Sequence, residues 1–121
     1  MRDNQLDYSV EQITVGCGAK QVVFNGLFAS LNPGDEVIIP GPCWVSYPDM
    51  VRLAGGKPVM VECSENEDFK LSPEAFEAAI TPRTKWLVLN SPLNPAGSVY
   101  GREHLAKLAE VLRCYSHVWI L

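Results

Sequence analysis

The stretch that decides the fold reads Trp86-Leu87-Val88-Leu89-Asn90-Ser91-Pro92-Leu93-Asn94-Pro95-Ala96-Gly97. Its first part, a run of apolar residues, predicts a strand buried on both faces, and a rigid turn rich in amide side chains follows directly. Pro92 and Pro95 fix the backbone angle φ and lower the cost of a cis peptide bond, while Gly97 permits angles closed to other residues. Open α/β sheets bind ligands at the carboxyl ends of their strands, so this turn predicts a site to which Asn94 contributes its side chain. The alternative is an ordinary turn between a strand and a helix.

The rest of the chain alternates in the same way. Short apolar runs predict further strands at residues 13–15, 37–39, 58–61 and 118–121, beside the one at 86–89. Helical patterns occupy residues 20–31, 47–54, 73–80 and 102–114. This order is typical of an α/β fold with a mostly parallel sheet and right-handed crossovers.

Two of the predicted helices carry local signals. Ser72 is the expected N-cap of the third helix, with Pro73 at its first position. In the last helix the apolar stripe expected to face inward consists of Leu105, Leu108, Ala109 and Leu112.

Composition narrows the classes of function. The chain has 121 residues, 47% of them hydrophobic and 20% charged, which fits one globular domain. No apolar run approaches the ~20 residues of a membrane-spanning helix, and the first five residues lack the apolar core of a signal peptide. A net charge of −4, with basic residues scattered along the chain, gives no footprint for nucleic acid. We therefore expect small-molecule chemistry, without a nucleic-acid or membrane partner.

The cysteines and histidines predict no metal site. Cys17, Cys43, Cys63 and Cys114 lie far apart, and no histidine stands at zinc-ligand spacing. This usage favours a reduced, cytoplasmic setting. His104 and His117 are interpreted as structural or solvent-facing residues.

A second informative segment, Gly16-Cys17-Gly18-Ala19-Lys20-Gln21, follows the predicted strand at 13–15 and opens a helix. Unpaired N–H groups and the positive end of the helix dipole suit a phosphate group there. The dinucleotide fingerprint would need glycine at position 21, and the Gly-Lys-Ser/Thr pattern of nucleoside triphosphatases is missing. One interpretation is a site for a phosphorylated cofactor that is neither a dinucleotide nor a nucleoside triphosphate. The other is a purely structural turn.

A third segment, Pro40-Gly41-Pro42-Cys43-Trp44-Val45-Ser46-Tyr47, comes after the predicted strand at 37–39 and so reaches the same edge of the sheet. The indole ring of Trp44 could stack on an electron-poor pyridinium ring, with an attraction of about 1 kcal/mol beyond burial. The alternative is that Trp44 is a core aromatic residue.

Five segments together resemble the class I aminotransferases, the fold-type-I enzymes that use pyridoxal 5′-phosphate, and within them the aspartate aminotransferase subgroup Ib. In family order these are RDNQLDY at 2–8, VGCGAKQ at 15–21, NPGDEV at 32–37, WVSYPD at 44–49 and NSPLNPAG at 90–97. The resemblance implies a partial three-layer α/β/α large domain. Residues 1–121 would form the N-terminal part of the cofactor-binding domain, without the small domain and the C-terminal half.

The resemblance also implies roles for particular residues. The backbone of Gly18, Ala19 and Lys20 would hold the phosphate of pyridoxal 5′-phosphate, Trp44 would stack on its ring, and Asn94 would hydrogen-bond its phenolic oxygen. Trp44 and Asn94 would also border the amino-acid substrate. Cys43 and Leu93 depart from the family pattern, where an aromatic and a small polar residue are common.

The catalytic lysine of the family matches no residue in this sequence. It is expected beyond Leu121, as are the aspartate that pairs with the pyridine nitrogen and the arginine that binds the substrate carboxylate. The chain as given is therefore not expected to transaminate. The implied reaction is transfer of an amino group between an amino acid and a 2-oxo acid, with aspartate favoured and prephenate or an aromatic amino acid as alternatives, usually in a homodimer.

Two other functions stay open. One is a non-catalytic domain that binds phosphate or pyridoxal phosphate. The other is a lyase or synthase that has the same fold and the same cofactor.

Overall fold

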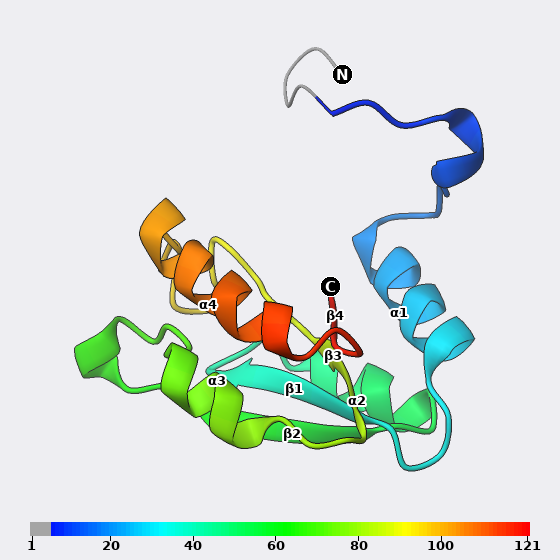
Figure 1. Cartoon of the computed structure of the whole chain (residues 1–121). Helices are drawn as coiled ribbons and strands as arrows, with labels where there is room; N and C mark the ends of the chain where they lie inside the picture. Colours follow the sequence, from blue (N-terminus) through cyan, green and yellow to red (C-terminus); the bar gives the residue numbers. More distant parts are fainter. Residues whose placement is uncertain (1–5) are drawn as a thin grey trace.

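The computed structural model describes residues 6–121 as helices, strands and two short 3-10 turns (Figure 1). The helices are α1 (Ala19–Ser30), α2 (Ser46–Leu53), α3 (Pro73–Ala79) and α4 (Arg102–Cys114). The strands are β1 (Glu36–Gly41), β2 (Lys57–Glu62), β3 (Thr84–Leu87) and β4 (Trp119–Ile120). The 3-10 turns are η1 (Val10–Gln12) and η2 (Glu65–Glu67). The first part of the motif at 2–8 lies outside the described residues.

The strands form one parallel sheet in the order β2-β1-β3-β4. In β1, Ile38 lies opposite Val59 of β2 and Leu87 of β3. The predicted α/β class with a mostly parallel sheet is confirmed. Because β1 and β3 are neighbours, the loops that follow their carboxyl ends start side by side at the same edge of the sheet.

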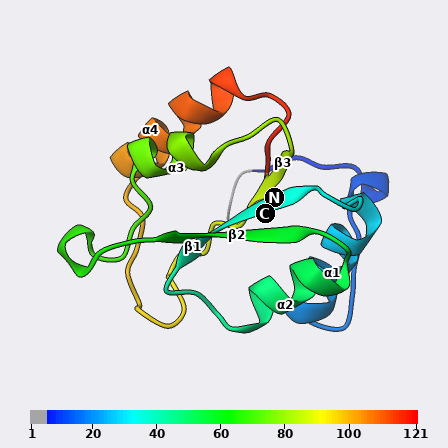
Figure 2. The ribbon, with the colours of Figure 1, turned by 90° about the horizontal axis from the view of Figure 1, so that it is seen from below.

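Helices cover both faces of the sheet, which makes three layers. Figure 2 shows α1 and α2 on one face and α3 and α4 on the other. Strand β1 contributes side chains to both cores, because successive side chains of a strand point to opposite faces of the sheet. Val37 and Ile39 pack into the core that includes Leu27 of α1, whereas Ile38 packs into the core that includes Phe76 of α3.

The sequence located most of these elements. The strands predicted at 37–39 and 58–61 lie within β1 and β2, and the helix predicted at 102–114 has the bounds of α4. The strand predicted at 86–89 begins and ends two residues earlier, as β3 (Thr84–Leu87), and the strand predicted at 118–121 is shortened to β4. The Ser72 hydroxyl accepts the Ala75 N–H at 3.2 Å, so the predicted N-cap of α3 is confirmed.

Two structural predictions are wrong. Residues 13–15 form no strand, because no other strand among the described residues lies beside them to share backbone hydrogen bonds. Ile13 nevertheless has extended backbone angles, φ −113° and ψ 124°. In α4, Leu105 is exposed rather than inward, while Leu108 is buried. His104 takes the inward position one residue earlier, with its Nε2 2.6 Å from the Leu71 carbonyl oxygen.

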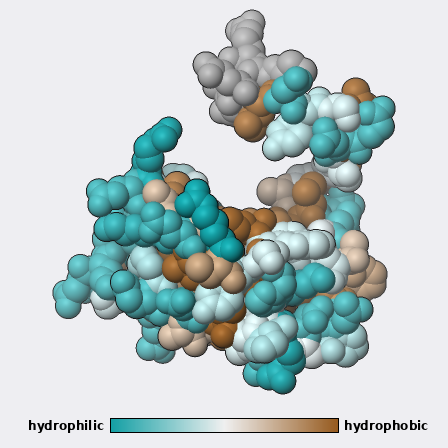
Figure 3. Space-filling model, in the orientation of Figure 1, coloured by the Kyte–Doolittle hydropathy of each residue, from teal (hydrophilic) through white to brown (hydrophobic). Residues whose placement is uncertain are grey.

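The segment before α1 extends away from the body of the molecule (Figure 1). Residues 6–20 are exposed throughout. Strand β4 also exposes apolar side chains, since Trp119 is 49% and Ile120 52% exposed. Figure 3 shows hydrophobic surface within a hollow of this face of the molecule. Within residues 6–121, no helix is both long enough and apolar enough to cross a membrane.

Candidate functional site

The start of α1 presents backbone donors without a side-chain cap. Gly18 is the N-cap residue, and its φ of +85° is a conformation that favours glycine. The first bond of the helix runs from the Val22 N–H to the Gly18 carbonyl at 3.3 Å, so the N–H groups of residues 19–21 have no acceptor within the helix. This end of α1 can bind an anion, with the helix dipole adding to the attraction.

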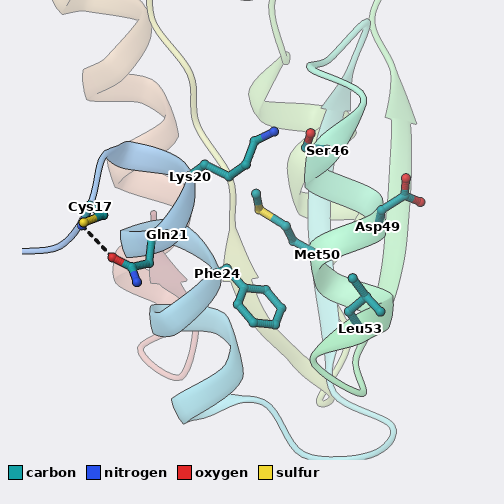
Figure 4. A pocket seen from close by; sticks show the side chains of 8 residues that line it. All are labelled: Cys17, Lys20, Gln21, Phe24, Ser46, Asp49, Met50 and Leu53. Carbon is teal, nitrogen blue, oxygen red and sulfur yellow. Dashed lines mark hydrogen bonds between the residues drawn. The ribbon is translucent and has the colours of Figure 1, made fainter.

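The turn before α1 is tight and held by its neighbours. The Cys17 N–H donates to Gln21 Oε1 at 2.5 Å, a bond drawn in Figure 4. The Gly18 N–H donates to the Gly16 carbonyl at 2.9 Å. A Cβ atom at Gly16 would approach the Val22 side chain to 2.9 Å, so a larger residue here would require that side chain to shift.

Trp44 lies in the loop between β1 and α2, next to the start of α1. Its ring is half-buried and packs against the core beneath α1 and α2. The edge-to-face contact with Tyr47 has ring centroids 5.3 Å apart, and Lys20 Nζ lies 4.8 Å from the Trp44 centroid. The fold thus brings two predicted site residues, Lys20 and Trp44, into direct contact.

The turn after β3 has the compact form that its sequence predicted. The bonds Ser91–Pro92 and Asn94–Pro95 are cis, and Gly97 has a φ of +78°. The Leu93 N–H donates to the Ser98 carbonyl at 2.8 Å, and the Gly97 N–H donates to the Leu93 carbonyl at 2.6 Å. Leu93 is buried beneath the turn, and Asn94 is exposed at its surface.

Three side chains that the sequence analysis did not single out support this turn. Asn90 Oδ1 accepts the Asn94 N–H at 2.9 Å. Ser91 Oγ accepts the Tyr100 N–H at 3.2 Å, and Ser98 Oγ donates to Asp68 Oδ1 at 3.2 Å. The one available signal was the residue type, since Asn side chains in turns often hydrogen-bond nearby backbone groups.

The loops after β1 and β3 also meet. A cavity of about 10 Å³ lies between them. Cys43 and Tyr47 line it from one loop, and Asn90 and Leu93 line it from the other. Trp44 and Asn94 therefore come from loops in contact, although neither residue lines this cavity itself.

A wider cavity, about 500 Å³, lies between α1 and α2 (Figure 4). Its walls include Phe24, Met50 and Leu53, and Lys20 borders it from the first turn of α1. This cavity is on the flank of the helices rather than at the carboxyl ends of the strands. We place the candidate site at the strand ends, because the polar turn and the uncapped helix start lie there.

The ionisable groups next to the loops favour neutral forms. Burial raises the pKa of the Cys43 thiol above its ordinary value. Burial also raises the pKa of Tyr47, with a smaller contribution from the negative charge of ionised Cys43, and burial raises the pKa of Tyr100. The charged group beside Trp44 is the Lys20 ammonium, which suits an anionic ligand.

The other lysines have partners elsewhere. Lys57 pairs with Glu36, Lys70 with Asp68 and Lys107 with Glu103, at 3.1, 2.7 and 3.3 Å. The Lys85 ammonium lies 4.9 Å from the Trp119 ring centroid. Lys20 is thus the lysine that contacts the candidate site.

Metal ligands are not clustered in the part of the chain that the structure describes, where no group of three or more His, Cys, Asp or Glu side chains could hold an ion. His104 binds the Leu71 carbonyl from α4. His117 is exposed, with Nε2 3.3 Å from the Thr81 carbonyl oxygen.

Comparison with known proteins gives matches over the whole sequence. A family model described as aminotransferase class I and II matches residues 1–121. An aspartate/prephenate aminotransferase of Cereibacter sphaeroides is 60% identical over 120 residues, covering 99% of this chain and 30% of that protein. An aspartate aminotransferase of Rhizobium meliloti is 52% identical, with 99% of this chain and 29% of that protein covered. The chain spans about 30% of the length of these curated relatives.

Solved structures agree with the fold. The crystal structure of the aspartate aminotransferase from Rhizobium meliloti superimposes with a TM-score of 0.96 at 52% identity, over 98% of this chain and 30% of that one. An aromatic aminotransferase from Pyrococcus horikoshii has a TM-score of 0.79 at 39% identity, over 85% of this chain and 27% of that one. Since the family model covers every residue, this chain belongs to the class I and II aminotransferases.

Proposed function

We propose that the full-length polypeptide carrying residues 1–121 is a pyridoxal-phosphate-dependent aminotransferase, and that this segment is the N-terminal part of its cofactor-binding domain. The observation that carries the proposal is the meeting of the predicted cofactor segments at one edge of the sheet. Lys20 of α1 lies against Trp44, which follows β1, and the loop of Trp44 packs against the turn that carries Asn94 after β3.

The residues present fit the chemical parts of pyridoxal phosphate. The uncapped start of α1 offers backbone N–H groups at residues 19–21 to a phosphate dianion, and the Lys20 ammonium adds a positive charge. Trp44 offers an aromatic face to the pyridine ring. The exposed amide of Asn94 can donate a hydrogen bond to the phenolic oxygen.

Each of these residues has a separate task in the proposed reaction. Pyridoxal phosphate, when bound, supplies the electron sink that allows an amino group to move between an amino acid and a 2-oxo acid. Trp44 excludes water from one side of the ring site and fixes the plane of the ring. Asn94 stabilises negative charge on the phenolic oxygen and borders the substrate. Gly18, Ala19 and Lys20 anchor the phosphate.

The lysine that would bond covalently to the cofactor is assigned to the remainder of the protein. Lys20 is the lysine near Trp44, but its place in the family motif is that of the phosphate-binding turn. The segment alone is therefore proposed to be inactive.

Aspartate is the proposed amino donor, because relatives from several bacteria are named aspartate or aspartate/prephenate aminotransferases. Those names also support prephenate as a proposed second substrate, and 2-oxoglutarate is the other proposed amino acceptor. By the same family relation the protein is proposed to be a homodimer. A cytoplasmic location is proposed because its four cysteines are free.

The test is amino transfer by the full-length polypeptide with pyridoxal phosphate. Aspartate would be supplied with either 2-oxoglutarate or prephenate, and the amino and oxo products quantified. Matched formation of a new amino acid and of oxaloacetate supports transamination. Ammonia release without amino transfer, or carbon–sulfur cleavage of a sulfur-containing amino acid supplied in a parallel assay, would identify a lyase of the same fold. Cofactor binding without turnover would identify a binding domain.

A further inference from the structure

The turn that carries Asn94 has few backbone donors with which to hold its shape. Two of its residues are prolines, which lack an N–H group. The bonds from Leu93 N–H to Ser98 and from Gly97 N–H to Leu93 close the turn on itself. Neither of them ties Asn94 to the sheet.

Asn90 provides that tie. Its Oδ1 accepts the Asn94 N–H at 2.9 Å. Asn90 directly follows Val88 and Leu89, which are bonded to both neighbours of β3. The Val88 N–H donates to the Ile38 carbonyl of β1 at 3.0 Å, and the Leu89 N–H donates to the Leu121 carbonyl, next to β4, at 2.9 Å. The Asn90 residue is half-buried and lines the cavity between the two loops, so packing as well as the sheet restrains it. The link therefore transmits the position of the strand to the Asn94 backbone.

We propose that Asn90 is a positioning residue, which orients Asn94 so that the Asn94 amide meets the phenolic oxygen of pyridoxal phosphate. This inference rests on the proposed function. The direction of the Asn94 Cα–Cβ bond follows from the positions of its backbone N, Cα and C atoms, so a bond that holds the Asn94 backbone also orients the start of its side chain. A binding group must be held within about 0.5 Å of its working position, and without the Asn90 bond the turn can rotate on its ends.

The same turn offers a matched control. Ser91 Oγ accepts the Tyr100 N–H at 3.2 Å, which anchors the far arm of the turn without touching Asn94. Removing the Ser91 hydroxyl deletes one side-chain to backbone bond, as does removing the Asn90 amide. The two variants differ in the donor that loses its acceptor, which is the Asn94 N–H in Asn90→Ala and the Tyr100 N–H in Ser91→Ala.

The experiment is an absorption titration of the full-length polypeptide with pyridoxal phosphate, comparing dissociation constants of the wild type, Asn90→Ala, Asn94→Ala, the double variant and Ser91→Ala. Asn94→Ala should weaken binding about tenfold, as expected for a hydrogen bond to a charged oxygen. Asn90→Ala should weaken it about three- to tenfold, and the double variant should match Asn94→Ala, because Asn90 acts through Asn94. Ser91→Ala should stay within about twofold of the wild type.

Two results would overturn the inference: unchanged affinity in Asn90→Ala, or a double variant whose loss is the product of the two single losses. Asn90→Ser, whose hydroxyl is too short to reach Asn94 in the same way, replaces Asn90→Ala if that variant does not fold. A wild type that binds no pyridoxal phosphate refutes the proposed function, and the inference falls with it. A wild type that binds and loses affinity with Asn94→Ala, but not with Asn90→Ala, refutes the inference alone.

Discussion

Glu36 is a buried carboxylate that bonds to neighbouring parts of the sheet, and replacing it with glutamine should destabilise the protein. Its side chain is 3% exposed at the start of β1. Glu36 Oε2 accepts the Thr81 hydroxyl at 2.6 Å, and Oε1 accepts Lys57 Nζ at 3.1 Å and an Arg83 guanidinium N–H at 3.4 Å. The carboxylate thus joins β1 to β2 and to the loop before β3.

The magnitude follows from the contacts. Glu36→Gln keeps the shape of the side chain but turns the Thr81 bond into a neutral one, a loss of about 1 kcal/mol. Lys57 and Arg83 are 65% and 67% exposed, so solvent screens their attraction to Glu36. Together the two ion pairs add about 0.5–1 kcal/mol. We therefore expect the free energy of unfolding to fall by about 1.5–2 kcal/mol at pH 7.

The difference should depend on pH. The Thr81 hydrogen bond is the largest cause that lowers the pKa of Glu36 in the folded protein, and the hydrogen bonds of Lys57 and Arg83 lower it further. A lowered pKa in the folded state means that the ionised group stabilises folding above the unfolded pKa of about 4.3, and that this stability is lost as pH falls through the folded value. The difference in the free energy of unfolding between the wild type and Glu36→Gln should therefore become smaller in acid.

Urea unfolding of the full-length polypeptide at pH 7 and pH 3.5 measures both effects. Glu103→Gln is the control, because Glu103 is exposed and pairs with Lys107 along one helix, so its loss should cost less than about 0.5 kcal/mol. A Glu36→Gln variant as stable as the wild type at pH 7, or a gap that widens at pH 3.5, would refute this reasoning.

Variants at three further positions test the core, a helix cap and the candidate site. Phe76→Ala should lower the free energy of unfolding by about 3–5 kcal/mol, because the ring is fully buried; a loss under 1 kcal/mol in urea unfolding would contradict the described core. Ser72→Ala should cost about 1 kcal/mol through loss of the bond to the Ala75 N–H, and Ser72→Asp, which keeps an accepting oxygen, should recover most of it in the same assay; equal losses would exclude capping as the cause. Trp44→Leu should weaken pyridoxal phosphate binding about fivefold or more while Trp44→Phe retains most of the affinity; equal effects in an absorption titration would argue against ring stacking.

The sequence predicted most of the fold because its signals are local. Apolar runs between polar turns located β1 and β2, and Ser72-Pro73 located the start of α3. The strand predicted at 13–15 failed because strand formation needs hydrogen bonds to a neighbour, and no strand in the described part of the chain lies beside it. Leu105 is exposed because α4 meets the core through His104 and Leu108 instead.

Parts of the candidate site depend on tertiary contacts that no local pattern encodes. Lys20 and Trp44 are 24 positions apart, and they meet because α1 and α2 pack on the same face of the sheet. The bond between Asn90 and Asn94 forms because the turn folds back on the end of β3. The motifs indicate Trp44 and Asn94 as candidates, whereas the role of Asn90 in supporting Asn94 follows from the conformation of the loop.

The most direct test of the account is where pyridoxal phosphate binds. The full-length polypeptide would be titrated with pyridoxal phosphate as the wild type, Trp44→Ala, Asn94→Ala and, as a control, Asn66→Ala in the exposed turn η2. We expect both Trp44→Ala and Asn94→Ala to weaken binding about tenfold and Asn66→Ala to leave it unchanged. Equal affinity in the wild type, Trp44→Ala and Asn94→Ala would contradict the assignment of the cofactor site to these strand ends.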